Sequence, residues 1–288
     1  MKTNRSNFWL VLVLALVAAS IVAARPASAQ STSGRNQGAL TFTGGLDVPS
    51  IYYFRGFRQE RDPKLTLWPF MDLGITFRSG DRPSERLGVN LGTWNSLNTG
   101  SSGLEGPAQA LHYEEDFYAT FAMGIGAGLG LGVTYTAYTS PNNMATTIKE
   151  ASVKVSRAGW LGPYGLVAFE LSDNGQADSG SSKGTYLEFG ASPSWRWKQL
   201  TVSGPLRVGL SAKDYYEGRD GDEFFGFFDV GGLVTYPLGV PERFGSWNVH
   251  GGASYLLLGD TTEARNIDQD GNISRHAIVT IFGVGVSY

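Results

Sequence analysis

The 288-residue chain contains no cysteine, which excludes disulfides, thiolate metal sites and cysteine nucleophiles. Charged residues make up only 17% of the sequence, against about a quarter in an average protein. The 23 basic residues are outnumbered by 26 acidic ones, which argues against a nucleic-acid partner because phosphate binding needs a basic face. Glycine (39 residues) and aromatic residues (12%) are abundant instead. This composition fits neither a disordered chain nor a helical bundle.

Long apolar runs are missing except near the N-terminus. There, a basic start is followed by the apolar stretch Trp9–Ala24 and by the small residues Ala27-Ser28-Ala29. This order is typical of a cleaved secretory signal peptide. A retained membrane anchor is the alternative, but the stretch is shorter than the ~20 residues that a spanning helix needs. We therefore predict a signal peptide over residues 1–29 and a single domain over 30–288, with no transmembrane helix.

The remaining chain alternates between apolar and polar residues. Because successive side chains of a strand point to opposite faces, this period of two predicts β-strands with one apolar face. We predict twelve of them, over residues 40–48, 66–78, 87–92, 116–125, 129–137, 150–155, 164–171, 185–197, 206–212, 224–236, 247–257 and 277–288.

The last of these strands ends on an aromatic residue. A chain that ends this way resembles bacterial outer-membrane barrels, in which the C-terminal strand is read by the barrel-assembly machinery. The resemblance implies that Phe282, Val284, Val286 and Tyr288 form an assembly signal.

The connections between the predicted strands alternate in length. Odd connections, such as Pro49–Lys64 and Gly259–Ser274, are mostly long and polar, whereas even ones, such as Gly126–Gly128 and Lys198–Gln199, are mostly tight turns. Together with the alternation, this sorting predicts an all-β fold: a transmembrane antiparallel up-and-down β-barrel of about twelve strands, whose apolar faces meet lipid. A soluble β-sandwich also alternates, but it has no reason to sort its loops.

The polar faces of the strands would then enclose a lumen with charges of both signs. One interpretation is a water-filled path for small polar solutes, and the other is an interior plugged by paired charges. Twelve strands lie between the filled eight-stranded barrel and the wide sixteen-stranded channel, so both interpretations stay open. The predicted lumen-lining residues are Asp47, Asp72, Arg78, Asp116, Glu150, Lys154, Glu170, Glu188, Arg196, Arg207, Asp229 and His250.

Few residues could support catalysis. His250 and Ser254 share a strand and a face, but four residues of strand separate them by about 13 Å, too far for a base and its nucleophile. We therefore predict no catalytic site.

One segment partly matches a calcium loop. Asn266, Asp268 and Asp270 precede Gly271 with the right spacing, but Ala277 stands where a bidentate glutamate is needed. The alternative is an Asp-Gly turn. These three residues are weak metal candidates, and we predict no metal and no other cofactor.

The first long connection carries a motif. The segment Tyr52-Tyr53-Phe54-Arg55-Gly56-Phe57-Arg58-Gln59 is followed by Gly92-Thr93-Trp94-Asn95-Ser96 and by the acidic patch in Tyr113–Tyr118. These segments resemble a family of uncharacterised proteobacterial exported proteins with a Tyr-x-Phe-Arg-Gly-x-x-Gln motif. The resemblance covers roughly residues 40–155, with Ile51 as a small departure. It implies an outer-membrane barrel and supplies no catalytic mechanism.

The sequence thus predicts an outer-membrane β-barrel of a Gram-negative bacterium, in contact with outer-membrane lipids and the assembly machinery. It would be a narrow channel for small polar solutes or a structural envelope protein, with its oligomeric state left open. The alternatives are an outer-membrane enzyme that modifies lipid or lipopolysaccharide and a soluble periplasmic β-sandwich that binds a ligand.

Overall fold

The computed structural model describes residues 38–79, 86–102, 111–143, 145–172, 182–218 and 221–288. The predicted signal peptide over residues 1–29 lies outside these ranges and stays a prediction. Among the residues that are described, no helix has the length and apolar character needed to cross a membrane.

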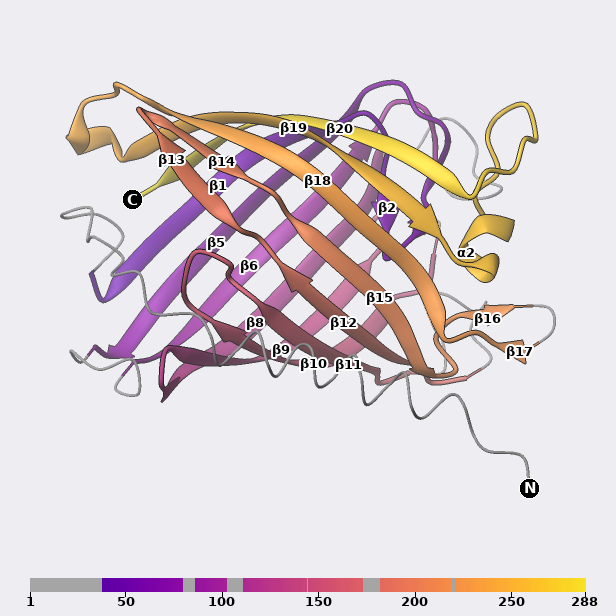
Figure 1. Ribbon diagram of the computed structural model, residues 1–288, viewed down its shortest axis with the longest axis horizontal. Helices are drawn as coiled ribbons and strands as arrows, with labels where there is room; N and C mark the ends of the chain where they lie inside the picture. The colour runs from indigo at the N-terminus through magenta and orange to yellow at the C-terminus, as the bar shows by residue number, and fades with distance from the viewer. Residues whose placement is uncertain (1–37, 80–85, 103–110, 144, 173–181, 219–220) are drawn as a thin grey trace. The chain divides into compact units, whose positions relative to one another are not determined.

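Twelve antiparallel strands form one closed sheet (Figure 1). Each strand pairs with the next, and the last pairs with the first. The predicted up-and-down barrel is therefore confirmed, in place of the two stacked sheets of a sandwich. In ring order the strands are β1 (Leu40–Pro49), β5 (Thr66–Arg78), β6 (Leu87–Asn98), β8 (His112–Gly126), β9 (Leu129–Thr139), β10 (Ile148–Arg157), β11 (Tyr164–Glu170), β12 (Thr185–Ala191), β15 (Leu206–Lys213), β18 (Phe225–Leu238), β19 (Ser246–Leu258) and β20 (His276–Ser287).

Two strands are interrupted by proline. The strand predicted over 185–197 divides into β12 and β13 (Ser194–Trp197), and its partner divides into β14 (Leu200–Ser203) and β15. Pro193 and Pro205 stand at the two breaks, because proline cannot donate a backbone hydrogen bond to the ladder. The short strands pair with each other, and β14 pairs onward with β18.

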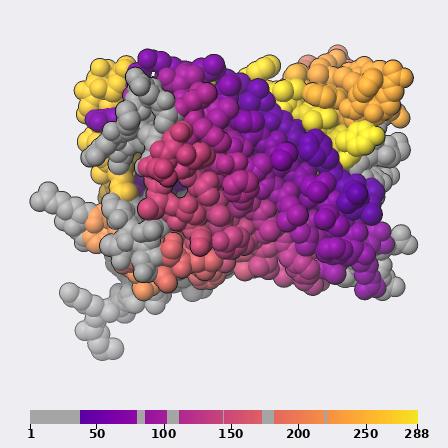
Figure 2. Space-filling view, turned by 180° about the vertical axis from the view of Figure 1, so that it is seen from behind, coloured from indigo at the N-terminus to yellow at the C-terminus, as the bar shows by residue number. Residues whose placement is uncertain are grey.

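Outward-facing positions of the barrel carry large apolar side chains. Along β5, β6 and β8, the exposed residues Met71, Leu73, Leu91, Phe117 and Phe121 point outward, and the strands of the first half of the chain form most of the face in Figure 2. Exposed aromatic residues lie near both ends of the strands, as membrane barrels require: Trp195, Trp197, Tyr236 and Tyr288 at one end, and Tyr135, Phe224 and Tyr255 at the other.

The two ends of the barrel differ. The end with tight turns, which we call the short-turn end, has one small helix, η2 (Glu242–Phe244). The other, the long-loop end, carries the additional elements (Figure 1). These are β2 (Tyr53–Phe54), β3 (Phe57–Arg58), β4 (Glu60–Asp62), β7 (Ser101–Ser102), β16 (Glu217–Gly218), β17 (Gly221–Asp222) and α2 (Asp260–Ala264).

The hydrophobic core lies inside the barrel, at the long-loop end. Inward-facing wall residues and residues of the long loops pack together there, so this mouth of the lumen is filled rather than polar throughout. The members are Phe57, Ala168, Tyr186, Tyr215, Tyr216, Phe227, Leu256 and Leu258.

Candidate functional site in the barrel lumen

The β1–β5 loop folds into the lumen as a tight hairpin. β2 and β3 pair across Arg55 and Gly56, whose φ angles are 46° and 86°. Two positive φ values define the type I′ turn that favours two-residue hairpins. Glycine is also needed for space, because a Cβ at Gly56 would lie 3.0 Å from Cβ of Phe227. We call residues Tyr53–Arg58 the inner hairpin.

Arg55 anchors the tip of the inner hairpin to the barrel wall. Its guanidinium donates two hydrogen bonds to Glu150 on β10, at 2.6 and 2.8 Å, and one to the Tyr215 hydroxyl at 2.9 Å. Its Cζ also lies 4.0 Å from the ring centroid of Tyr186. The side chains of Arg55 and Glu150 are 11% and 3% exposed. Burial is the largest single effect and lowers the pKa of Arg55, but the neighbouring Glu150, Tyr215 and Tyr138 together outweigh it and the pKa is raised, so Arg55 remains a cation.

The β15–β18 loop and the β19–β20 loop also hold the inner hairpin. The Tyr216 hydroxyl donates to the carbonyl of Arg55 at 2.9 Å, and the Tyr53 hydroxyl donates to Asn266 Oδ1 at 2.6 Å. The rings of Phe57 and Tyr216 also pack at 5.5 Å. The long-loop end is therefore one interlocked unit.

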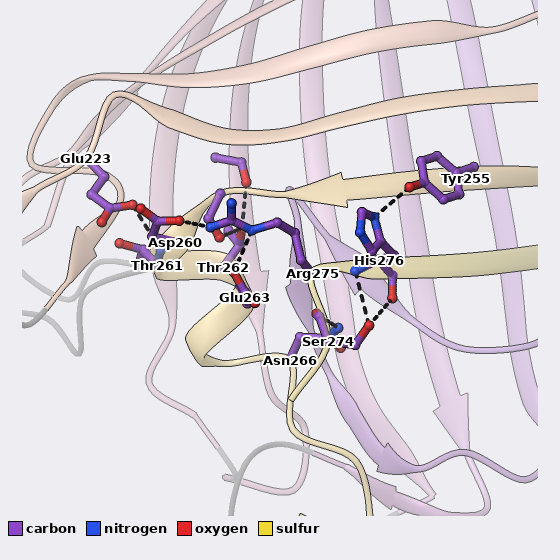
Figure 3. A network of polar contacts seen from close by, with 12 residues as sticks. Glu223, Tyr255, Asp260, Thr261, Thr262, Glu263, Asn266, Ser274, Arg275 and His276 are labelled. Atoms are coloured by element: carbon purple, nitrogen blue, oxygen red, sulfur yellow. Dashed lines mark hydrogen bonds and ion pairs between the residues drawn. The ribbon is translucent and has the colours of Figure 1, made fainter. Parts of the chain in front are cut away.

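The β19–β20 loop is fixed by its own polar network (Figure 3). Arg275 forms ion pairs with Asp260 and Glu263 of α2. The Thr262 hydroxyl donates to the carbonyl of Gly226 at 2.5 Å, which ties α2 to β18. These contacts position Asn266, the partner of Tyr53.

An aromatic and acidic cluster occupies the opposite wall of the same mouth. Tyr52, just before the inner hairpin, lies 5.3 Å from the ring centroids of both Trp68 and Trp94. Its hydroxyl donates to Glu114 at 3.0 Å. Asp116 faces the lumen beside Trp94. We call the following residues the mouth cluster: Tyr52, Trp68, Trp94, Tyr113, Glu114 and Asp116.

Glu60 holds the part of the β1–β5 loop that leads from the inner hairpin back to β5. Its side chain is fully buried and accepts hydrogen bonds from the backbone N–H of Tyr52 at 2.8 Å and from the Thr66 hydroxyl at 2.6 Å. Burial raises the pKa of Glu60, although both hydrogen bonds oppose the shift.

The predicted lumen charges on the β10–β18 wall have partners. Arg207 donates to Asp229 at 2.9 Å. Glu188 accepts hydrogen bonds from the hydroxyls of Tyr164 and Tyr186, each at 2.6 Å. The remaining predicted residues of this wall are Glu150 bound to Arg55, Glu170 accepting from the N–H of Gly184 at 2.7 Å, and Lys154 placed 4.2 Å from the Tyr164 ring centroid.

Two predicted residues meet where the barrel closes. Asp47 on β1 and His250 on β19 lie 2.8 Å apart across β20, at a position where β20 has Gly283. A Cβ at Gly283 would lie 2.2 Å from the Asp47 carboxylate, so the contact depends on glycine. The other ring nitrogen of His250 contacts Asn248 at 3.1 Å. The described residues provide no serine hydroxyl bonded to either nitrogen.

Asp72 follows the same pattern on another strand pair. It is hydrogen-bonded to Tyr118, and the tyrosine ring lies over Gly92 of the intervening strand. A Cβ at Gly92 would lie 2.3 Å from the Tyr118 hydroxyl. The abundant glycine thus lets inward side chains meet across a strand.

One predicted lumen residue does not line the interior. A β-bulge between Thr76 and Arg78 breaks the alternation and pairs Arg78 with Leu87, and Arg78 is exposed. The prediction was wrong for Arg78 because strict alternation was carried to the strand end. Arg196 lies in β13 at the short-turn rim and is exposed, and its register through Thr201 and Thr235 places it on the same face as His250.

The three weak metal candidates do not converge. Asn266 is buried and bound to Tyr53, whereas Asp268 accepts hydrogen bonds from the backbone N–H groups of Asp270 and Asn272 within its own turn. Hydrogen bonds from Asn272 lower the pKa of Asp268. No described group of three metal-ligating side chains is close enough to hold an ion.

Sequence reasoning missed the inward path of the β1–β5 loop. It placed the Arg55 motif in a connection outside the barrel and did not include Arg55, Tyr52 or Glu114 among the lumen residues. One signal was available. A loop with Tyr52, Tyr53, Phe54 and Phe57 has too much aromatic surface to stay in water.

Comparisons with known proteins give remote similarities only. No protein-family model matches the chain, and no curated protein matches its sequence. An outer membrane channel from Pseudomonas putida F1 aligns at 12% identity and a TM-score of 0.47, over 89% of this chain and 98% of the other. The NanC porin aligns at 10% identity and a TM-score of 0.43, over 86% of this chain and 99% of the other. Outer membrane phospholipase A from Escherichia coli aligns at 10% identity and a TM-score of 0.43, over 85% of this chain and 89% of the other.

Proposed function

We propose that the protein is an outer-membrane β-barrel of a Gram-negative bacterium that conducts small polar solutes past the inner hairpin. The observation that carries this proposal is the distribution of side chains on a closed barrel. Apolar residues face outward on every side where lipid must be met, and carboxylates, hydroxyls and glycines face inward. A closed sheet leaves no unpaired strand edge, which hydrocarbon requires.

The inner hairpin sets the expected conductance. It crosses the mouth of the barrel from the mouth cluster to Glu150 and packs against the opposite wall. A twelve-stranded barrel is narrower than the wide porins, and a bound hairpin narrows it further. We therefore expect small unitary steps rather than the large steps of an open barrel.

Planar-bilayer recording of the refolded protein tests the proposal. Heat-modifiable gel migration first establishes that the barrel has folded. Wild-type protein should give small current steps in KCl, and Arg55→Ala should give larger or more frequent ones, because the hairpin loses its anchor. If folded wild-type protein and folded Arg55→Ala both leave the bilayer silent, the channel proposal fails and a structural envelope role replaces it.

We propose that the protein is not an enzyme. Among the described residues, both ring nitrogens of His250 are occupied, one by Asp47 and the other by Asn248, which leaves neither for a serine hydroxyl. The test is His250→Ala: release of fatty acid from phospholipid vesicles should be the same for the variant, the wild-type protein and protein-free vesicles. Wild-type release that the variant loses would overturn this part of the proposal.

We also propose that the last strand is read by the barrel-assembly machinery. Tyr288 exchanges two backbone hydrogen bonds of 2.8 Å with Phe42 of β1, so the terminal residue also completes the closure. Deleting Tyr288 should lower the amount of protein recovered in the outer-membrane fraction of cells. Refolding into detergent in vitro separates the two roles: a variant that refolds normally has lost only its signal.

A further inference from the structure

The lumen carboxylates that pair with arginine lie on one wall. On the β10–β18 wall, Glu150 and Asp229 each have an arginine, while Glu170 and Glu188 accept hydrogen bonds from neutral donors. On the β5–β8 wall, none of the inward carboxyl groups Asp72, Glu114 and Asp116 has a cationic partner among the described residues. Asp72 is hydrogen-bonded to Tyr118, Glu114 accepts from Tyr52, and Glu114 and Asp116 are hydrogen-bonded to each other. A hydrogen bond between two carboxyl groups needs a proton, so Glu114 and Asp116 share one proton and carry one negative charge between them, and no described cation balances that charge in the mouth cluster.

Asp116 is the least satisfied of these groups. Its side chain is only 8% exposed, and Oδ1 has no hydrogen-bond partner among the described residues. Register places it on the inner face between Trp94 of β6 and Tyr138 of β9. A buried carboxylate oxygen without a donor is costly unless a donor is supplied from elsewhere.

Aromatic rings cluster around Trp94, the register neighbour of Asp116. Trp68, Trp94 and Tyr52 pack together with centroid separations of 5.3 Å, and no cation lies over any of the three rings in the described structure. By contrast, Arg55 already occupies the ring faces of Tyr186 and Phe54. Indole and phenol faces attract a cation, and a carboxylate accepts its N–H groups.

We propose that the mouth cluster binds a solute that bears a primary ammonium group, with Asp116 Oδ1 as the acceptor and Trp94 as the aromatic face. This inference deepens the channel proposal and rests on it for its biological meaning. A metal ion is a poorer match for the cluster, because no described set of three ligating side chains converges and hard cations prefer several oxygens. An ammonium group needs one carboxylate and gains from the rings.

The test is isothermal titration calorimetry of folded, detergent-solubilised protein with n-butylammonium chloride at constant ionic strength. n-Butanol is the neutral control ligand of similar shape. Wild-type protein should bind n-butylammonium saturably and n-butanol not at all. Asp116→Asn should weaken binding on the order of ten-fold, since a charge-assisted hydrogen bond contributes that much, and Trp94→Leu should also weaken it.

Asp270→Asn is the matched control, because it removes one carboxylate from an exposed turn. It should bind n-butylammonium as the wild type does. Equal affinity of Asp116→Asn and wild type, or equal binding of n-butanol, would overturn the proposal. Asp116→Asn should fold as the wild type does, because an amide of the same shape can still hydrogen-bond to Glu114, and gel migration checks this.

The binding test is independent of conduction. Saturable binding by a protein that gives no current would reject the channel and keep the site. Current steps without binding would reject the site and keep the channel.

Discussion

Arg55 is the residue on which the interior depends most. It is drawn into a buried site by a bidentate carboxylate and three aromatic rings. A guanidinium suits this site because it is planar, stacks on rings and forms two parallel hydrogen bonds with one carboxylate, which a lysine cannot do.

We expect Arg55→Ala to destabilise the folded barrel by about 3–5 kcal/mol, because Glu150 would remain buried without its partner. Urea unfolding followed by tryptophan fluorescence measures the loss. The double variant Arg55→Ala/Glu150→Gln should recover part of it, since the orphan charge is gone. A double variant no more stable than Arg55→Ala would mean that ring packing, not charge, holds the tip.

Glu60 should make stability depend on pH. Its pKa in the folded protein is raised above the ordinary value of 4.5, so the folded state holds the proton more tightly than the unfolded chain. Its contribution is therefore full below about pH 4.5 and is lost as pH rises through the folded pKa.

The variant Glu60→Gln keeps a hydrogen-bonding side chain but cannot ionise. The free energy of unfolding of wild type minus that of Glu60→Gln should fall as pH is raised from 4 to 7, and urea titrations at several pH values measure it. A difference that is flat, or that grows with pH, contradicts the assignment.

At the scale of the element, the inner hairpin combines a local turn with long-range contacts that hold it in place. The turn needs positive φ at both Arg55 and Gly56. Glycine adopts such an angle freely, whereas arginine does so at a cost that the contacts of its side chain offset. The long-range contacts are the burial of Phe57 in the core and the hydrogen bonds that the hydroxyls of Tyr53 and Tyr216 donate.

Gly56→Ala tests whether the stability of the protein depends on the turn of the inner hairpin and on its close contact with Phe227. The substitution places a side chain at a φ of 86° and within 3.0 Å of Phe227, and we expect a loss of at least about 1–2 kcal/mol. The thermal midpoint at which the heat-modifiable form disappears measures it. Gly239→Ala is the control, because its Cβ would meet nothing within 4 Å, and it should leave the midpoint unchanged.

The closure of the barrel is a second element-scale test. Gly283→Ala forces a methyl group between Asp47 and His250 and should cost about 1–3 kcal/mol as an overpacking change. Gly232→Ala, at an exposed position of β18 where a Cβ would meet nothing within 4 Å, should be close to neutral. Equal effects of the two substitutions on the urea midpoint would mean that the Asp47–His250 contact does not stabilise the closure.

At the scale of the whole molecule, the barrel wall and the segments that fill its long-loop end are held by different kinds of interaction. The wall is held by a continuous ladder of antiparallel strands from β1 to β20, and its outside is set by the need for apolar surface. The long-loop end is filled by segments far apart in sequence, as the contacts of Tyr53 with Asn266 and of Arg55 with Glu150 demonstrate.

The sequence was a good guide to the wall. The strand over 129–137 and the strand over 247–257 each lie within the observed β9 and β19, because alternation is a local signal that every strand repeats. It failed at Pro193, where one strand became two, and at Arg78, where a bulge shifts the register. Both are local interruptions of the period on which the prediction depended.

The amino-acid sequence by itself determined the all-β class, the strand number, the inward and outward faces and the sorting of the loops, since each depends on residues close together along the chain. Only the tertiary structure decided that the β1–β5 loop turns inward, that Arg55 finds Glu150 and that Asp116 is left with a free oxygen. Those outcomes depend on which side chains of distant strands share one interior, and closure of the sheet alone sets that.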